Sequence, residues 1–356
     1  AHTRRPARIA VGTTEVWGST RNRSLDPHTQ NETVADKRFD VVGIGNAIVD
    51  VIAHVGDDFI HANALNKGNM TLIDADRGSE LYALMPPAIE ASGGSAANTM
   101  AGVASFGGSV AYVGKVRRDQ LGEVFRHDIR AVGVHYAQEL ADAGPPTARC
   151  LILVTPDAER TMNTFLGISS LLEPDDVSEE LVAAGRVIYC EGYLWDVDSA
   201  KAAIRKAMEL GKAAGAKVAL TLSDTFCVDR HRAEFLQLVE HYVDIVFANE
   251  AEICALYETA DVEAAMAKVR GHAEIACVTR SAKGSVILTA DEVVAVPSWS
   301  TGEVVDTTGA GDLYAAGFLY GFTAGKDLFT SGWYGSVAAG ECISHTGPRP
   351  ERQLAE

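Results

Sequence analysis

The chain of 356 residues is 47% hydrophobic, so it can bury a large core, and its formal net charge at pH 7 is −17. Such an acidic balance argues against a nucleic-acid partner, because nucleic-acid binding requires basic groups that replace the counterions of the phosphates. The sequence also lacks the apolar run of about 18 residues that a membrane span requires. These properties exclude nucleic-acid-binding and membrane-spanning classes of protein.

Residues 1–37 differ in composition from the rest of the chain. They are rich in Arg, Thr, Ser and Asn and show little apolar periodicity. A targeting segment, an artificial extension and a disordered tail are all compatible with this composition. We interpret residues 1–37 as a flexible N-terminal extension with no part in catalysis, and residues 38–356 as the folded domain.

From residue 39 onward, short β-branched runs alternate with longer runs of good helix formers. The predicted strands are residues 40–44, 110–113, 150–154, 187–190, 218–222, 245–247, 275–278 and 286–288. The predicted helices include residues 95–106, 199–215, 230–242, 262–271 and 328–343. This alternation indicates an α/β fold with a mostly parallel central sheet flanked by helices, whose ligands bind beyond the carboxyl ends of the strands.

Two stretches break this alternation. In residues 49–69 and again in residues 110–164, strand-like segments come without full helical partners. They predict a small β-sheet that projects from the main body. From the sequence, this sheet is either a lid over a ligand pocket or an ordinary β-meander at the edge of the fold.

The six cysteines are far apart in the sequence and show neither Cys-x-x-Cys nor His/Cys ligand spacing. Most of them lie in apolar strand- or helix-like runs, which is typical of buried free thiols. Free thiols persist in a reducing compartment, so we expect a cytoplasmic protein.

The most informative motif is Asp306-Thr-Thr-Gly-Ala-Gly-Asp312, which precedes an apolar helical stretch. Gly309 and Gly311 carry no Cβ, so the backbone can approach a ligand closely, and the first N–H groups of a helix have no intrahelical partner. The helix dipole adds to the attraction for an anion. Asp312 in the first turn can accept a proton from a hydroxyl nucleophile. The motif predicts an anion site beside a general base, although a plain helix start would carry similar residues.

The same motif resembles the signature of the ribokinase-like (PfkB) family of carbohydrate and nucleoside kinases. Residues 39–51, 91–98, 249–252 and 279–284 resemble further motifs of this family, in the right order. The resemblance extends from residue 39 to residue 350, and residues 220–226, 243–250 and 346–350 are most similar to adenosine kinases. It implies a ribokinase-like fold with a small β-sheet lid over the sugar pocket.

The activity that the resemblance implies is ATP-dependent phosphoryl transfer to the primary hydroxyl of a ribofuranoside, adenosine in the first place. Residues 163–170 follow the adenosine kinase segment only loosely, so a sugar kinase of the ribokinase or fructokinase type is the alternative. A non-catalytic nucleoside-binding protein is a third reading. The expected partners are a small nucleoside or sugar and ATP, bound by a monomer or a homodimer.

Phosphoryl transfer requires in-line positioning, charge neutralisation and a route for the hydroxyl proton. We expect Asp312 to be the base, and the amides of Gly309, Ala310 and Gly311 to hold the oxygens of the transferring group. The resemblance adds Arg160 as a phosphate clamp from the lid side. An exposed turn arginine is the alternative for that residue.

Asn249 and Glu252 are three residues apart, so they share one face of a helix. The resemblance assigns this pair to the placement of Mg²⁺ and phosphate through water, and a solvated Mg²⁺ needs only one or two carboxylate or amide oxygens. The same spacing also fits a capping box at a helix start. A requirement for a monovalent cation is left open.

Asn46, Asp50, Gly93, Gly94 and Asn98 are predicted to form the acceptor pocket. A carboxylate such as Asp50 can accept hydrogen bonds from two vicinal hydroxyls of a ribose. The two glycines allow backbone amides to approach the sugar, and the amide of Asn98 offers both a donor and an acceptor.

The remaining predicted ligand contacts come from the resemblance. It implies that Phe226 packs on adenine, although a Phe at the end of a strand usually lies in the core. On the nucleotide side it implies that Thr279, Gly284 and Thr308 contact ATP, and that Ser336 lies near the ATP base.

Overall fold

The computed structural model describes residues 37–157, 159–300 and 302–355. The predicted N-terminal extension lies outside these residues, except for its last residue, Lys37. The ammonium group of Lys37 donates hydrogen bonds to the carbonyl oxygens of Ala183 (3.0 Å) and Gly185 (2.8 Å). Lys37 therefore belongs to the folded domain rather than to the extension.

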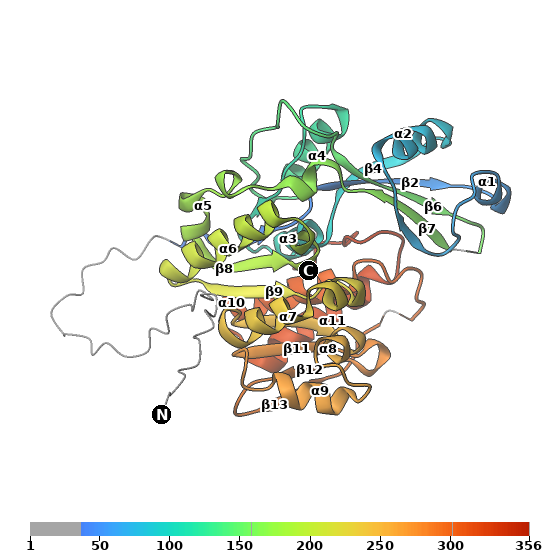
Figure 1. Ribbon diagram of the computed structural model, residues 1–356. Coiled ribbons are helices and arrows are strands. Elements are labelled where there is room, and N and C mark those ends of the chain that lie inside the picture. The colour runs from blue at the N-terminus through green and yellow to red at the C-terminus, as the bar shows by residue number, and fades with distance from the viewer. Residues whose placement is uncertain (1–36, 158, 301, 356) are drawn as a thin grey trace, which may run out of the picture. The chain divides into compact units, whose positions relative to one another are not determined.

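Eight strands form the larger of two sheets in the described chain (Figure 1). Six of its strands, β11, β10, β9, β8, β1 and β5, pair in parallel, and β12 and β13 add an antiparallel edge. All predicted strands except residues 150–154 lie in this sheet, so the prediction of a mostly parallel central sheet is confirmed. In spatial order the strands are β13 (Val293–Val296), β12 (Ser285–Leu288), β11 (Ile275–Thr279), β10 (Ile245–Asn249), β9 (Lys217–Thr221), β8 (Gly185–Glu191), β1 (Phe39–Ile44) and β5 (Val110–Val113).

Helices cover both faces of the larger sheet, because both faces of its strands are apolar. One face carries α6 (Asp198–Ala213), α7 (Thr225–His241), α8 (Glu250–Leu256) and α9 (Val262–Val269), with the short α5 (Glu179–Ala183) at its edge. The other face carries α3 (Ser95–Ser105), α4 (Gln120–Ala131), α10 (Ala310–Thr323) and α11 (Leu328–Cys342).

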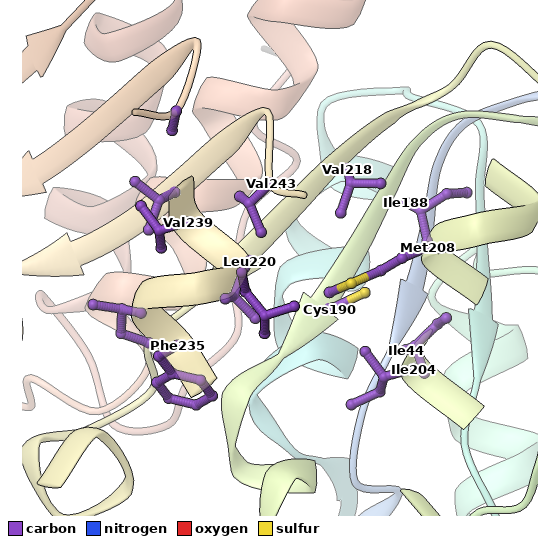
Figure 2. Packing of buried hydrophobic residues seen from close by; sticks show 14 of the residues in the cluster. Ile44, Ile188, Cys190, Ile204, Met208, Val218, Leu220, Phe235, Val239 and Val243 are labelled. Atoms are coloured by element: carbon purple, nitrogen blue, oxygen red, sulfur yellow. The ribbon is translucent and has the colours of Figure 1, made fainter. Parts of the chain in front are cut away.

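Side chains on alternate positions of each strand enter the two layers of core. Figure 2 shows the layer under α6 and α7, where Ile204 and Met208 of α6 pack beside Ile44, Ile188 and Cys190 of the sheet. All five of these side chains are completely buried. Burial of this kind stabilises the fold by about 1.5–3 kcal/mol for each large aliphatic side chain. The rigid sheet that results holds the loops at its carboxyl edge in place.

A second sheet of five strands contains β3 (Met70–Leu72), β7 (Arg160–Phe165), β6 (Ala148–Val154), β2 (Ile48–His54) and β4 (Ile89–Gly93), in that spatial order. We call it the small sheet. In Figure 1 it projects from the larger sheet, and α1 (Asp57–Ala62) and α2 (Ala75–Leu84) lie against it. Val49, Val51 and Ala53 of β2 pack into buried clusters, so alternation along the strand places Asp50 on the opposite face of the small sheet.

The predicted boundaries of this projection need correction. Residues 110–113 form the edge strand β5 of the larger sheet, and the stretch between β5 and β6 contains the twelve-residue helix α4. All four residues of β5 are buried, which is typical of a strand in a parallel sheet rather than of a projecting hairpin. Strands β3 and β4, which complete the small sheet, lie outside both predicted stretches.

All six cysteines are free thiols, and only Cys254 is not fully buried. No helix within the described residues is both long enough and apolar enough to cross a membrane.

Candidate active site

The candidate site lies at the carboxyl ends of β1 and β8. Strand β1 lies between β5 and β8. The chain therefore continues from β1 to a strand on one side and later returns to a strand on the other side, so the strand order reverses at β1. A crevice outside the carboxyl ends of the strands at such a reversal is the usual ligand site of an open α/β sheet. Asn46 follows β1, Glu191 ends β8, and the first turns of α3 and α10 meet in front of them through a hydrogen bond from Ser95 to Asp312.

The loop before α10 has the geometry of an anion site. Gly309 is in the left-handed conformation (φ 78°), and a Cβ there would lie 2.7 Å from the Cα of Pro348, so only glycine fits. The amide of Ala310 donates to Thr307 O (3.3 Å), whereas the amides of Gly309 and Gly311 donate to no described residue. A Cβ at Gly311 would meet open space. Two unpaired amides at a helix start therefore lie where a ligand can approach.

Asp312 is placed beside these amides and is held by two donors. The hydroxyl of Ser95 donates to its Oδ1 (2.6 Å), and the amide of Asn98 donates to its Oδ2 (3.4 Å). Burial raises the pKa of Asp312 to about 6, the two hydrogen bonds lower it, and the negative charge of Asp50 raises it further. At pH 7 the carboxylate is thus mostly ionised and close to the point of taking up a proton, as a general base requires.

Asp50 lies on the face of β2 that is turned away from α1 and α2, beside the strand β4 that leads into α3. It is buried, and burial raises its pKa to about 6 despite the opposing positive charges of Arg349 and Arg160. Its carboxylate packs against the Cα of Gly93, where any side chain would collide with it. At Gly94 the backbone adopts φ 99°, and a Cβ would collide with the carbonyl of Asn46. The predicted glycine pair therefore makes room for the carboxylate and for the turn into α3.

Asn46 is brought to the pocket, but its amide is already engaged. Its Nδ2 donates to Glu191 Oε1 (3.0 Å), and its Oδ1 accepts from the hydroxyl of Ser169 (2.9 Å). The predicted direct contact with the acceptor would cost one of these bonds. The structure thus gives Asn46 the geometry of a supporting residue rather than that of an open donor.

Glu191 is a site residue that the sequence did not indicate. It is almost completely buried and accepts hydrogen bonds from Asn46 and from the backbone amide of Ala96 (3.0 Å) in the first turn of α3. Burial raises its pKa to about 7, and the charge of Asp312 raises it as well. A single carboxylate thus ties the ends of β1 and β8 to the helix that carries Ser95 and Asn98. Its only signal in the sequence is an acidic residue at the end of an apolar strand.

Arg160, at the start of β7, reaches the anion loop from the small sheet. Its Nη2 lies 2.8 Å from Asp306 Oδ2, both side chains are more than nine-tenths buried, and its Nη1 donates to Thr308 Oγ1 (3.5 Å). The alternative reading as an exposed turn arginine is therefore wrong. The positive charge of Arg160 is held against the anion loop, with the loop's own aspartate as its partner.

Asn249 and Glu252 form a complete capping box at the start of α8. The Asn249 side chain accepts from the amide of Glu252 (2.9 Å), and the Glu252 carboxylate accepts from both the backbone and the side-chain nitrogens of Asn249 (3.0 and 2.6 Å). Burial raises the pKa of Glu252 to about 7, with further contributions from Asp224 and Asp312. Glu252 therefore lies close enough to Asp312 for the charge of Asp312 to act on it.

The hydrogen bonds of the capping box limit how Asn249 and Glu252 could bind a divalent ion. Within the described residues, no group of three or more His, Cys, Asp or Glu side chains is placed to hold a metal ion. Both oxygens of Glu252 already accept hydrogen bonds, so direct coordination by the pair does not fit. Carboxylate oxygens keep further lone pairs, which suits contact with the water shell of Mg²⁺.

The predicted nucleotide-side residues lie along the neighbouring strands. Thr279 ends β11 in register with Asn249, and Gly284 lies in the turn before β12 at φ 86°, where a Cβ would collide with Val296 O. Thr308 belongs to the anion loop. Ser336 is buried within α11, where it is 6% exposed.

Phe226 is not where the sequence predicted it. It lies in the first turn of α7, after the N-cap Asp224, rather than at the end of a strand, and it is 72% exposed. The alternative that Phe226 lies in the core is therefore wrong, whereas its predicted contact with adenine stays a prediction. Strand β9 ends at Thr221, and the chain turns into α7 directly after Asp224, so Phe226 belongs to a helix and not to the end of the strand.

Tyr193 is an aromatic residue of the site that the sequence did not indicate. It lies in the 3₁₀ turn Gly192–Asp196 directly after β8, and its hydroxyl donates to Ser223 O (3.3 Å). Burial raises its pKa, and the charges of Glu191, Asp312 and two further carboxylates raise it as well. The half-buried ring therefore lies at the carboxyl end of β8, two residues after Glu191.

A carboxylate beside free helix-start amides and opposite a polar pocket is the arrangement that phosphoryl transfer to a hydroxyl requires. Comparison with known proteins gives the class. Residues 71–353 match the model of the pfkB family carbohydrate kinases, and the chain belongs to this family. It is accordingly a phosphotransferase that acts on an alcohol group.

The similar proteins include both nucleoside and sugar kinases. The solved structure of adenosine kinase from Sinorhizobium meliloti is 54% identical, with a TM-score of 0.83 over 89% of this chain and 98% of that one. A probable sugar kinase from Rhizobium etli CFN 42 is 52% identical, with a TM-score of 0.84 over 90% and 97% of the two chains. Adenosine kinase from Saccharomyces cerevisiae is 28% identical over 86% of this chain and 96% of its own length.

Proposed function

We propose that this chain transfers a phosphoryl group from ATP to the primary hydroxyl of a ribofuranoside, with adenosine as the favoured acceptor. The observation that carries the proposal is the position of Asp312 between the unpaired amides of Gly309 and Gly311 and the pocket residue Asn98. The similarity to the S. meliloti adenosine kinase supports the choice of acceptor. The free, buried thiols are consistent with a reducing cytoplasmic setting.

The transfer follows from the groups in place. Asp312 accepts the proton of the acceptor hydroxyl, and Ser95 and Asn98 hold its carboxylate in position. The amides of Gly309 and Gly311 hold the oxygens of the transferring group, with the helix dipole behind them. Arg160 exchanges its contact with Asp306 for the phosphate, which adds a charge-assisted hydrogen bond.

The acceptor is recognised on two sides. Asp50 carries no hydrogen bond from a described side chain, so its carboxylate is open to the two vicinal hydroxyls of a ribose. We assign the aromatic contact with the base to Tyr193 rather than to Phe226. Tyr193 stands among the site carboxylates, whereas Phe226 is exposed on α7.

A panel of acceptors tests the proposal. ADP release from ATP is measured with adenosine, guanosine, inosine, ribose and fructose at equal concentrations. We expect adenosine to give the highest kcat/KM. Turnover confined to the free sugars would contradict the nucleoside assignment and favour the second candidate, a sugar kinase, which the similarity to the probable sugar kinase of R. etli supports.

Mg²⁺ bound with ATP neutralises phosphate charge, and Glu252 is the residue that we expect to place its water shell. Replacing Glu252 with Gln is expected to raise the Mg²⁺ concentration for half-maximal rate several-fold. The unfolding temperature should fall slightly, because Gln keeps one acceptor oxygen of the capping box and loses the other. The control is Glu250→Gln. It removes a carboxylate from the same helix turn, but this carboxylate forms an ion pair with Arg280. An unchanged Mg²⁺ titration with a raised acceptor KM would show that Glu252 acts on the acceptor instead.

The acid limb of the pH profile is expected near pH 6. Asp50 and Asp312 each have a pKa of about 6 and must both be ionised, so kcat/KM falls as the pH falls through this value. Below pH 5 the logarithm of kcat/KM should drop with a slope of about 2, since the two protonations add. In the Asp50→Asn variant the slope should become about 1. A wild-type slope of 1 would mean that only one of the two carboxylates controls the reaction.

A further inference from the structure

The closing segment of the chain passes behind the anion loop. The amide of Gly347 donates to Asp306 Oδ2 (2.9 Å), and Pro348 packs against Gly309 so closely that a Cβ on Gly309 would lie 2.7 Å from its Cα. Further on, the amide of Ala355 donates to Ser105 O at the end of α3. This course carries Arg349, which lies between these contacts, to the back of the acceptor pocket.

Arg349 contacts three elements of the pocket at once. Its Nη1 donates to Ser92 Oγ on β4 (2.6 Å) and lies 3.3 Å from Asp128 Oδ2 on α4, and its Nε donates to Asn98 Oδ1 on α3 (3.1 Å). Its Nη2 is buried and has no hydrogen-bond acceptor among the described residues. A guanidinium with planar donors in fixed directions holds several groups at defined angles.

The contact with Asn98 fixes the orientation of that amide. A guanidinium only donates, so the amide atom that faces Arg349 must be the oxygen. The amide nitrogen is consequently turned toward Asp312, to which it donates at 3.4 Å. Without the guanidinium, the Asn98 amide could flip and present its oxygen to the carboxylate, which would repel the general base rather than hold it.

The charge of Arg349 also acts on Asp50. The groups that face this carboxylate are Arg349 from the closing segment, Arg160 from β7, Cys150 from β6 and Asp312 from α10. Burial raises the pKa of Asp50, and Arg349 is the strongest influence that lowers it, ahead of Arg160. The negative charge of Asp128 on α4 partly neutralises the positive charge of Arg349.

We propose that Arg349 is a positioning residue of the acceptor site, which holds Asn98 with its amide nitrogen toward Asp312 and supplies the positive charge behind Asp50. The proposal rests on the proposed acceptor site. It links the closing segment, the anion loop and the acceptor pocket through one side chain.

The test separates the effect of the positive charge of Arg349 from the effect of the hydrogen bonds that its guanidinium donates. Arg349→Met removes both, and Arg349→Lys keeps the charge. In the Met variant we expect the acid limb of kcat/KM to move up by about one pH unit, since a nearby opposite charge shifts a carboxylate by 1–3 units. A several-fold loss of kcat should remain at pH 8. The Lys variant should keep the acid limb near the wild-type position and show the same loss of kcat. The matched control is Arg352→Met, because Arg352 is exposed and the hydrogen bond it accepts from Ser105 is to its backbone carbonyl, which the substitution keeps.

Asp128→Asn gives a prediction of opposite sign, because it removes the anion that balances Arg349 while leaving an oxygen for Ser92. The acid limb should move to lower pH. This variant keeps the test decisive if Arg349→Met does not fold. In an Asp50→Asn background, Asp128→Asn should not move the remaining limb by more than a few tenths of a unit.

An acid limb that stays in place in folded Arg349→Met or Asp128→Asn protein would overturn the proposal, as would an Asp128→Asn shift of equal size in the Asp50→Asn background. The measurements use whichever acceptor the wild type phosphorylates in the panel described above. If that acceptor is a free sugar, the nucleoside assignment fails, and the test of Arg349 proceeds unchanged.

Discussion

Replacing Asp312 with Asn is expected to lower kcat by roughly 10²–10⁴-fold, the usual contribution of a positioned general base. The carboxylate has a pKa of about 6 and lies beside the unpaired amides of the anion loop, so it can accept the proton of a hydroxyl bound there. Asn keeps the size of the side chain and can still accept from Ser95. Binding of ATP, measured by calorimetry without an acceptor, should stay within a few-fold of the wild type.

The control for this loss is Asp291→Asn, which removes an equal charge from an exposed turn between β12 and β13. Its kcat should match that of the wild type. Near-normal turnover in folded Asp312→Asn protein would show that the proton leaves by another route, and the assignment of the base would have to be abandoned.

Replacing Asp50 with Ala is expected to lower kcat/KM for adenosine by about 2–4 kcal/mol, since charge-assisted hydrogen bonds contribute about 1.5–3 kcal/mol each. The same variant should discriminate far less between adenosine and 2′-deoxyadenosine than the wild type does. Removing the ligand hydroxyl and removing the carboxylate delete the same interaction, so their effects are not additive.

The pH of this measurement matters because the two carboxylates interact. The charge of Asp50 raises the pKa of Asp312, so its removal makes Asp312 a more acidic group. At pH 8 Asp312 is ionised in both proteins, and the comparison then reports on the acceptor contact alone. If the discrimination ratio survives in folded Asp50→Ala protein, Asp50 does not contact the ribose, and the acceptor lies elsewhere along the edge of the sheet.

The elements of the larger sheet could be predicted because their signals are local. Runs such as residues 218–222 and 275–278 are apolar on both faces, which is typical of strands covered by helices on both sides. The anion loop could be predicted for the same reason, because two glycines, an acidic residue and a helix start lie within seven residues. Residues 110–113 show the limit of this approach: the sequence indicated a strand, but only its pairing with β1 assigns it to the larger sheet.

Phe226 and Tyr193 show a second limit. Both are aromatic residues close to the end of a strand, and a sequence pattern does not say which of them faces the crevice. The difference arises because α7 begins at Thr225 and turns Phe226 outward, whereas Tyr193 enters the 3₁₀ turn beside Glu191. The direction of a side chain after a strand depends on the loop that follows, and that loop is set by its packing.

The sequence by itself determined the α/β architecture, the anion loop and the acidic residues Asp50 and Asp312. The architecture follows from periodicity, the anion loop and Asp312 follow from glycines at a helix start, and Asp50 follows from the resemblance to the family's substrate motif. Only the tertiary structure decided which of these groups act on each other. Arg160 forms an ion pair with Asp306, and Asn46 and Asn98 form hydrogen bonds with Glu191 and Arg349. More than a hundred residues of chain separate the two partners in each case. Burial at these meeting points shifts the pKa values of the carboxyl groups, because desolvation and nearby charge depend on distance in space and not on distance along the chain.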